Sequence, residues 1–120
     1  MKHVFHLSTC SSCRRILKEI APGNDFFIQN IKDQAVTSEQ LDLLASLSGS
    51  YQSLFNRQAR KYREMELFKK ELSEDEIRQL ILDEYTFLKR PIFVIGSQLF
   101  ICKNKENISN LKKAMLTVRQ

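Results

Sequence analysis

The chain has 120 residues, 42% of them hydrophobic and 28% charged, which is typical of a single globular domain with its own core. No apolar run is long enough to span a membrane, no signal peptide is evident, and three cysteines are too few for a secreted disulfide framework, so we expect a cytoplasmic protein without a membrane partner. The net charge of +5 comes without a dense basic run and interleaved aromatic residues, so we expect no direct contact with nucleic acid.

A strand, a helix and a second strand are predicted in succession from the N-terminus. Residues 2–7 are apolar at most positions, as in a central strand covered on both faces. A helix with apolar residues at helical spacing follows and ends near the Ala-Pro-Gly of residues 21–23. Residues 26–28 then predict a second strand. This order implies a parallel pair joined by a right-handed crossover, and hence an α/β fold.

Two cysteines lie at the turn between the first strand and the first helix. The N–H groups and the dipole of a helix N-terminus stabilise a thiolate, so they lower the pKa of Cys10. Arg14 and Arg15 add positive charge nearby. Cys13 lies one helical turn further on, where its sulfur can attack an adduct formed on Cys10 and release it as a disulfide. The pattern predicts a thiol redox site with Cys10 as nucleophile and Cys13 as resolving cysteine.

Two other interpretations of this pair are weaker. A structural zinc site needs four ligands, and the remaining candidates, His3, His6 and Cys102, have no ligand spacing, so no metal is expected. Burial of both cysteines as small hydrophobic residues fits poorly with the serines and arginines around them. For His6, a hydrogen-bonded core position is favoured over a role as proton carrier. For Cys102, a plain buried or edge thiol is favoured over a distant third redox cysteine.

The middle of the chain, about residues 36–88, reads as helical. Thr37 with Gln40, and Ser73 with Glu76, have the spacing of capping boxes, which predicts helices that start near residues 38 and 74. The intervening segment, residues 51–67, predicts short irregular helical pieces rich in arginine and lysine. The second of the two helices is expected to place one apolar face in the core, formed by Ile77, Leu80, Ile81, Tyr85 and Leu88.

A β-hairpin and a final helix complete the chain. Residues 92–95 and 98–101 are two apolar, β-rich runs separated by Gly-Ser, which predicts a hairpin with a two-residue turn. The last helix follows Asn104 and is expected to turn one side inward, formed by Ile108, Leu111, Met115 and Val118.

The order of these elements and motifs resembles the ArsC/Spx family over nearly the whole chain. A βαβ unit that opens on CxxC-Arg, a helical insertion and a ββα unit introduced by Lys-Arg-Pro-Ile is the thioredoxin-like order of that family. The resemblance implies an α/β fold with a mixed sheet, flanking helices and an inserted helical subdomain at about residues 36–88, all within one domain of residues 1–120. The family contains glutaredoxin-coupled arsenate reductases and redox-sensing transcriptional regulators.

The resemblance also implies roles for individual residues. The nucleophilic cysteine of the family matches Cys10, and the arginine after the motif matches Arg14. The arginine before the family's cis-proline matches Arg90, so Pro91 is expected to follow a cis peptide bond. The alternative for Pro91 is an ordinary proline at the start of a strand.

Two of the matched anion-binding positions depart from the family pattern. The central motif Asn-Thr-Arg-Gly-x-x-Tyr-Arg corresponds to residues 56–63, where Gln58 occupies the place of the oxyanion-binding arginine. Arg57 or Arg60 could substitute for it. The third arginine of the reductases is matched by Lys103, which keeps the charge but lacks the planar fork that grips an oxyanion at two points.

Two classes of function follow from the resemblance. The first is a thiol-dependent reductase that acts on a small oxyanion or a disulfide, without a bound cofactor, and receives electrons from glutathione and glutaredoxin or from thioredoxin. The second is an Spx-like regulator that binds RNA polymerase and uses the cysteine pair as a switch. A redox-inert binding protein would leave the two cysteines unexplained.

Overall fold

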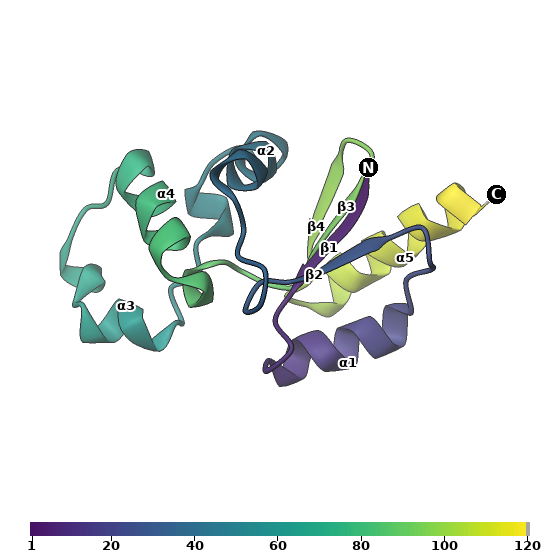
Figure 1. Cartoon of the computed structure of the whole chain (residues 1–120), viewed down its shortest axis with the longest axis horizontal. Coiled ribbons are helices and arrows are strands. Elements are labelled where there is room, and N and C mark those ends of the chain that lie inside the picture. Colours follow the sequence, from purple (N-terminus) through teal and green to yellow (C-terminus); the bar gives the residue numbers. More distant parts are fainter. Residues whose placement is uncertain (120) are drawn as a thin grey trace. The chain divides into compact units, whose positions relative to one another are not determined.

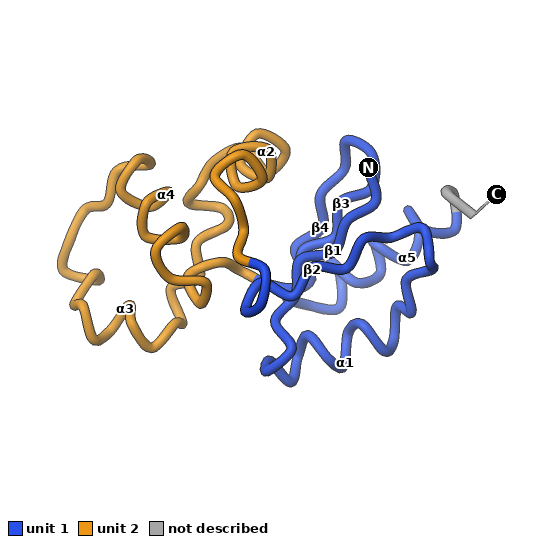
Figure 2. The backbone as a smooth tube through the Cα atoms, in the orientation of Figure 1, with its two compact units in different colours: residues 1–34, 90–120 blue, residues 35–89 orange. Residues whose placement is uncertain are grey.

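The computed structural model describes residues 1–119, and the side chains of residues 1–116. The backbone divides into two compact units (Figure 2): residues 1–34 together with 90–120, and residues 35–89. The second unit is therefore inserted in the chain of the first. The predicted inward position of Val118 lies outside the described side chains.

The first unit is built on a four-stranded mixed sheet (Figure 1). Its strands are β1 (Lys2–His6), β2 (Phe27–Asn30), β3 (Ile92–Ile95) and β4 (Gln98–Ile101), in the order β2-β1-β3-β4. β1 and β2 run parallel, whereas β1–β3 and β3–β4 are antiparallel. The predicted α/β class, parallel pair and hairpin are thus confirmed, with β2 one residue later and longer than expected.

Two helices, α1 (Ser11–Ile20) and α5 (Lys105–Arg119), pack on one face of this sheet (Figure 1). Val4 and Phe93 are partners in the β1–β3 register and are completely buried under both helices. α1 ends at Ala21 in the left-handed conformation, at φ 47°, just before the Pro-Gly pair that predicted its end. The core of this face consists of Val4, Ile16, Ile20, Phe26, Phe93, Ile95, Cys102, Ile108, Leu111 and Met115.

The opposite face of the sheet holds a polar pair formed by a buried glutamine and a half-buried histidine. Gln29 on β2 is 1% exposed, and its Oε1 lies 2.8 Å from Nε2 of His3 on β1. Because a carboxamide oxygen only accepts, the imidazole Nε2 carries the proton in this bond. The Gln29 Nε2 group donates in turn to the carbonyl of Gln34 at 2.9 Å. Burial lowers the pKa of His3 despite this bond, so the ring is neutral and fits its acceptor.

The inserted unit, residues 35–89, contains helices α2 (Ser38–Ser48), α3 (Arg60–Glu64) and α4 (Glu74–Asp83). The hydroxyl of Thr37 accepts from the Gln40 amide, and the Gln40 side chain accepts from the Thr37 amide. Ser73 and Glu76 form the same reciprocal pair at α4. Both predicted capping boxes and helix starts are confirmed. Short 3₁₀ turns complete the unit at Gln52–Leu54, Leu67–Lys69 and Tyr85–Phe87.

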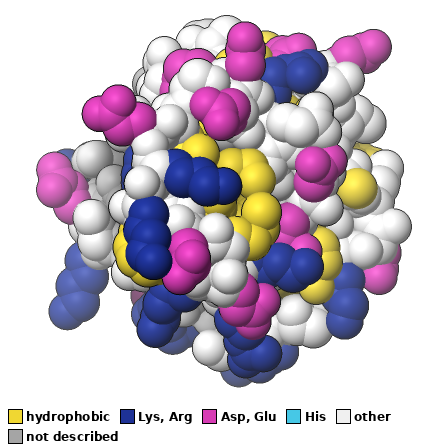
Figure 3. Space-filling model, turned by 90° about the vertical axis from the view of Figure 1, so that its left-hand side faces the viewer, with side chains coloured by type: hydrophobic (Ala, Val, Ile, Leu, Met, Phe, Trp, Pro, Cys, Tyr) yellow, Lys and Arg dark blue, Asp and Glu magenta, His cyan; other side chains and the backbone are white. Residues whose placement is uncertain are grey.

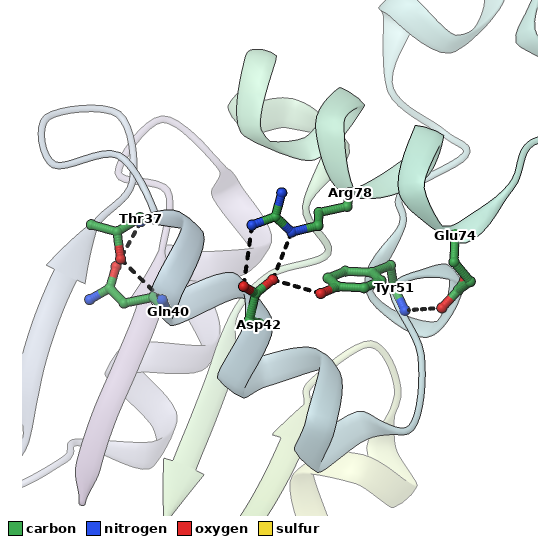
Figure 4. Close-up of polar contacts among 6 residues, drawn as sticks. All are labelled: Thr37, Gln40, Asp42, Tyr51, Glu74 and Arg78. Atoms are coloured by element: carbon green, nitrogen blue, oxygen red, sulfur yellow. Dashed lines mark hydrogen bonds and ion pairs between the residues drawn. The ribbon is translucent and has the colours of Figure 1, made fainter.

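Polar contacts join the helices of the insertion (Figure 4). The Arg78 guanidinium of α4 donates to both carboxylate oxygens of Asp42 on α2, at 2.8 and 3.2 Å. The Tyr51 hydroxyl donates to the same carboxylate at 2.6 Å, and the Tyr51 amide donates to Glu74 at 2.8 Å. These bonds hold the start of the irregular segment against α4.

The last residues of the insertion pair with an earlier segment of the same unit. Phe55 and Leu88 form an isolated antiparallel bridge, and the Lys89 amide donates to the Leu54 carbonyl at 2.8 Å. Because the chain near Leu88 is extended and paired with Phe55, α4 ends at Asp83. The predicted helical face therefore ends earlier than the spacing of its apolar residues suggests. Tyr85 is consequently 37% exposed in a 3₁₀ turn, and its prediction as core is wrong.

Replacement of the Ser73 cap is expected to weaken α4. Ser73→Ala leaves the Glu76 amide without its side-chain acceptor, which costs about 1 kcal/mol in the free energy of unfolding. Urea denaturation measures the loss. Ser109→Ala, in the exposed interior of α5, is the matched control and should be neutral or slightly stabilising, because alanine is the better helix former. Equal losses in both variants would contradict the capping role.

Candidate active site

Cys10 occupies the N-cap position of α1. Its backbone is extended, at φ −90° and ψ 117°, its amide donates to Leu7 at 3.0 Å, and its carbonyl accepts from the Arg14 amide at 3.1 Å. The first turn of α1 contains no acidic residue. The N-terminal N–H groups therefore meet the sulfur without a competing carboxylate, which is the arrangement that favours a thiolate.

The pKa of the Cys10 thiol lies below its usual value. Partial burial by itself would raise the pKa, but hydrogen bonds from the backbone and the side chain of Cys13 lower it. The positive charge of Arg90 and its hydrogen bond lower the pKa further. Cys10 is half-buried, so a reagent from solvent can still reach its sulfur.

Cys13 differs from Cys10 in both burial and pKa. It is completely buried, and burial is the main reason why its pKa rises to about 11. The neighbouring Cys10 sulfur raises it further, since two thiolates this close repel. The pair therefore combines one accessible thiol that ionises readily with one buried thiol that stays protonated at neutral pH.

Arg90 and Pro91 lie beside this pair. The peptide bond between them is cis, as the resemblance implied. Pro91 is buried and its carbonyl accepts from the Cys102 amide at 3.0 Å, while Arg90 is half-buried next to the Cys10 sulfur. The structure thus brings together Cys10, Cys13, Arg90 and Pro91.

Arg14 serves a different contact in the structure. Its Nη1 donates to the Ser8 carbonyl at 3.0 Å, and the side chain is exposed. The arginine that lowers the pKa of Cys10 is Arg90, which is distant in sequence, whereas Arg14 holds the turn that presents Cys10. A direct catalytic role for Arg14 stays a prediction.

Cys102 lies closer to Cys10 and Cys13 than we expected from the sequence. It is 1% exposed, as predicted for a buried thiol, but the charge of Cys13 adds to burial in raising its pKa to about 12. The hairpin register carries the signal that was missed: Ile92 pairs with Ile101, so the next pair outward is Pro91 and Cys102. A residue opposite the cis-proline is also a neighbour of the cysteines.

The other predicted anion-binding residues lie elsewhere in the chain. Lys103 follows β4, in the first unit, and its side chain is exposed. Arg57 and Arg60 belong to the inserted unit. Arg57 is held by aromatic groups: Nη1 donates to the Tyr62 hydroxyl at 3.1 Å, and the guanidinium lies 5.6 Å from the centre of the Phe55 ring. Arg60 begins α3 and is exposed.

A family comparison decides the assignment. The model of the ArsC family matches residues 5–111, which is most of the chain. The chain belongs to the ArsC family. The comparison with curated proteins finds no match.

Solved structures of ArsC-type proteins share the fold. A protein from Bacteroides fragilis described as ArsC family related has a TM-score of 0.77 at 24% identity, over 92% of this chain and 96% of that chain. An arsenate reductase from Vibrio cholerae has a TM-score of 0.77 at 20% identity, over 91% of this chain and 95% of that one. An arsenate reductase (ArsC) related protein from Brucella melitensis has a TM-score of 0.69 at 17% identity, over 91% and 92%. The predicted thioredoxin-like ArsC architecture is confirmed.

Other features of this ArsC family chain bear on its site. In the part that the structure describes, no group of three or more His, Cys, Asp or Glu side chains is placed to hold a metal ion. No helix among the described residues is long and apolar enough to cross a membrane.

His6 is half-buried, and within the described residues its Nδ1 atom has no hydrogen-bond partner, unlike the hydrogen-bonded core histidine that the sequence favoured. Burial lowers its pKa.

The two thiols of the ArsC motif should react with iodoacetamide over different pH ranges. Only the thiolate is alkylated, so Cys10 labelling should rise to its plateau with a midpoint below about 8.5, the value of a free cysteine. Cys13 should remain unlabelled in the folded protein at neutral pH, because it is buried and its pKa is about 11. Peptide mapping after timed alkylation measures both. Faster labelling of Cys13 would reverse the assigned roles.

Proposed function

We propose that this chain is a thiol-dependent reductase of the arsenate reductase type. The observation that carries the proposal is the pairing of a half-exposed Cys10, whose pKa is lowered by Cys13 and Arg90, with a buried, protonated Cys13. A nucleophilic thiolate with a second thiol behind it is the arrangement needed for two-electron reduction through a disulfide.

The proposed reaction has two steps on the protein. The Cys10 thiolate attacks the oxidised centre of the substrate, such as the arsenic of arsenate, and a water or hydroxide leaves. Cys13 then gives up its proton and attacks the Cys10 sulfur; the bond from sulfur to the substrate breaks, and its electron pair leaves with the substrate atom. The products are a two-electron-reduced substrate, such as arsenite, and a Cys10–Cys13 disulfide, which glutathione with glutaredoxin, or thioredoxin, reduces.

Positive charge near Cys10 serves both steps. Arg90 stabilises the attacking thiolate, and a guanidinium in that place also offers hydrogen-bond donors to an oxyanion. The rest of the proposed anion set is Lys103 and one of Arg57 and Arg60. This set differs from that of the reductases at Gln58 and Lys103, so we expect arsenate turnover to be slow.

The repair of these two positions tests the proposal. Gln58→Arg combined with Lys103→Arg should raise arsenate turnover by about a hundredfold, the usual effect of one preorganised donor on a transition-state oxyanion. The assay supplies glutathione with glutaredoxin and thioredoxin in parallel. The matched control is Gln98→Arg with Lys105→Arg, which makes the same changes at exposed positions elsewhere. High turnover by the unmodified chain would contradict the prediction and direct the next substitutions to Arg57 and Arg60.

A regulator of the Spx type is the second candidate function. It is favoured by Gln58 and Lys103, which weaken the anion set, and by large hydrophobic side chains that the insertion exposes. Figure 3 shows such side chains on one face, surrounded by Lys and Arg interspersed with Asp and Glu. By their exposed fractions, the large hydrophobic side chains that the insertion exposes are those of Leu43, Met65, Phe68 and Tyr85. Absence of turnover before and after the repair, together with capture of RNA polymerase by the purified chain, would favour the regulator.

A further inference from the structure

Cys102 is the one cysteine to which the proposed reaction gives no task. Side chains alternate along a strand, so Cys102, just past the end of β4, points to the same side as Phe100. Phe100 packs against the buried core on this face of the sheet, and Cys102 belongs to the same cluster as Ile16 of α1. Cys13 and Ile16 are buried three residues apart, on one side of α1. Helix and sheet thus bring Cys13 and Cys102 toward each other.

A backbone contact fixes this approach. The Cys102 amide donates to the Pro91 carbonyl at 3.0 Å, and Pro91 is joined to Arg90, which contacts Cys10. The two sulfurs are also close enough for the charge of Cys13 to raise the pKa of Cys102. Three free thiols therefore gather around the Arg90-Pro91 peptide, ordered from the half-exposed Cys10 to the buried Cys13 and Cys102.

We propose that Cys102 is a third redox thiol of this site, which takes the disulfide over from Cys10 by attacking Cys13. The proposal rests on the proposed function, because the Cys10–Cys13 disulfide is its starting point. Cys102 loses its proton and its sulfur bonds to the Cys13 sulfur. The bond between Cys10 and Cys13 breaks, and Cys10 leaves as a thiolate, which is free to take up a proton. No further oxidant is needed, since one disulfide and one thiol exchange places.

The direction of the exchange follows from the leaving groups. A thiol of lower pKa leaves faster, and Cys10 has the lowest pKa of the three. Arg90 and the helix N-terminus stabilise it as it leaves. Because Cys102 must first ionise against a raised pKa, the transfer should be slower than formation of the first disulfide. Its result is a buried Cys13–Cys102 disulfide and an accessible Cys10 thiol.

Tryptic peptides report directly on this transfer. Cys10 and Cys13 share the peptide of residues 3–14, and Cys102 lies in the peptide of residues 90–103, since trypsin does not cut before Pro91. The reduced protein is treated with one equivalent of diamide, quenched with acid at increasing times, alkylated after denaturation, and digested. The disulfide within peptide 3–14 should form first and decay as a cross-linked pair of 3–14 and 90–103 accumulates, with the alkyl label moving from Cys102 to Cys10.

Two variants separate the possible failures. Cys102→Ala should lose the cross-linked pair entirely and keep the disulfide within peptide 3–14, with its fold checked by circular dichroism. Cys10→Ser, oxidised in the same way, should form the cross-link between Cys13 and Cys102 directly, since the proposal requires their Cα atoms to lie within the roughly 7 Å that a disulfide spans. A persistent disulfide within 3–14, with Cys102 alkylated at all times and no cross-link in Cys10→Ser, would overturn the proposal for Cys102 alone. No disulfide within 3–14 in the unmodified chain would overturn the proposed function and this proposal with it.

Discussion

Cys10→Ser is expected to abolish reductase activity. A serine hydroxyl stays protonated where the Cys10 thiol ionises, so the nucleophile that Cys13 and Arg90 stabilise is lost. Removal of a catalytic nucleophile lowers turnover by a factor on the order of 10⁴ or more. Steady-state assays on arsenate, and on a small disulfide as a second substrate, measure the loss.

The loss of turnover in Cys10→Ser is best compared with the loss caused by replacing the resolving cysteine, Cys13. Cys13→Ser should retain part of the activity when glutathione is supplied, because an external thiol can attack the adduct on Cys10 in place of Cys13. Cys10→Ala serves as a second variant of the nucleophile, free of any residual hydroxyl. Turnover in Cys10→Ser close to that of the unmodified chain would place the nucleophile at another residue.

Phe93→Ala is expected to cause the largest loss of stability in the first unit. Phe93 is completely buried at the centre of the sheet, opposite Val4 and beneath α1 and α5. Truncation of a buried phenylalanine to alanine typically costs about 3–5 kcal/mol through lost burial and the cavity that remains. This is a large part of the roughly 5–15 kcal/mol that holds a domain folded. The sheet should therefore unfold at a much lower urea concentration.

Phe68→Ala is the matched control for that measurement. Phe68 is 56% exposed in the insertion, so the same change of side chain should alter the free energy of unfolding by no more than about 0.5 kcal/mol. A small loss in Phe93→Ala, or similar losses in the two variants, would contradict the position of Phe93 at the centre of the core.

Local sequence signals predicted the elements of the fold well. The spacing of Thr37 and Gln40, and of Ser73 and Glu76, marks a helix start because both halves of a capping box lie within one turn. The Gly-Ser turn between two apolar runs predicted the hairpin equally well, because this signal also lies within a few neighbouring residues. Tyr85 shows the limit of such signals. Its spacing continues the helical pattern, but the helix ends before it, where Leu88 pairs with Phe55, 33 residues earlier in the chain.

The site depended on contacts that the local sequence does not contain. Arg14 follows the cysteine motif directly, but its side chain turns to the Ser8 carbonyl, and the charge beside Cys10 comes from Arg90. Only the resemblance to a family pointed to Arg90 and to a cis bond at Pro91. Buried Gln29 had no signal either, because its partner His3 becomes a neighbour only once the parallel strands are paired.

The closure of the insertion at Lys89 links its folding to the chemistry of the thiol. The Lys89 amide donates to the Leu54 carbonyl, and the next residue along the chain is Arg90, whose charge and hydrogen bond contribute to lowering the pKa of Cys10. Local opening of residues 35–89 that breaks this bond releases the chain one peptide bond away from that guanidinium. We therefore expect the reactivity of Cys10 to report whether the insertion is folded, although Cys10 itself belongs to the other unit.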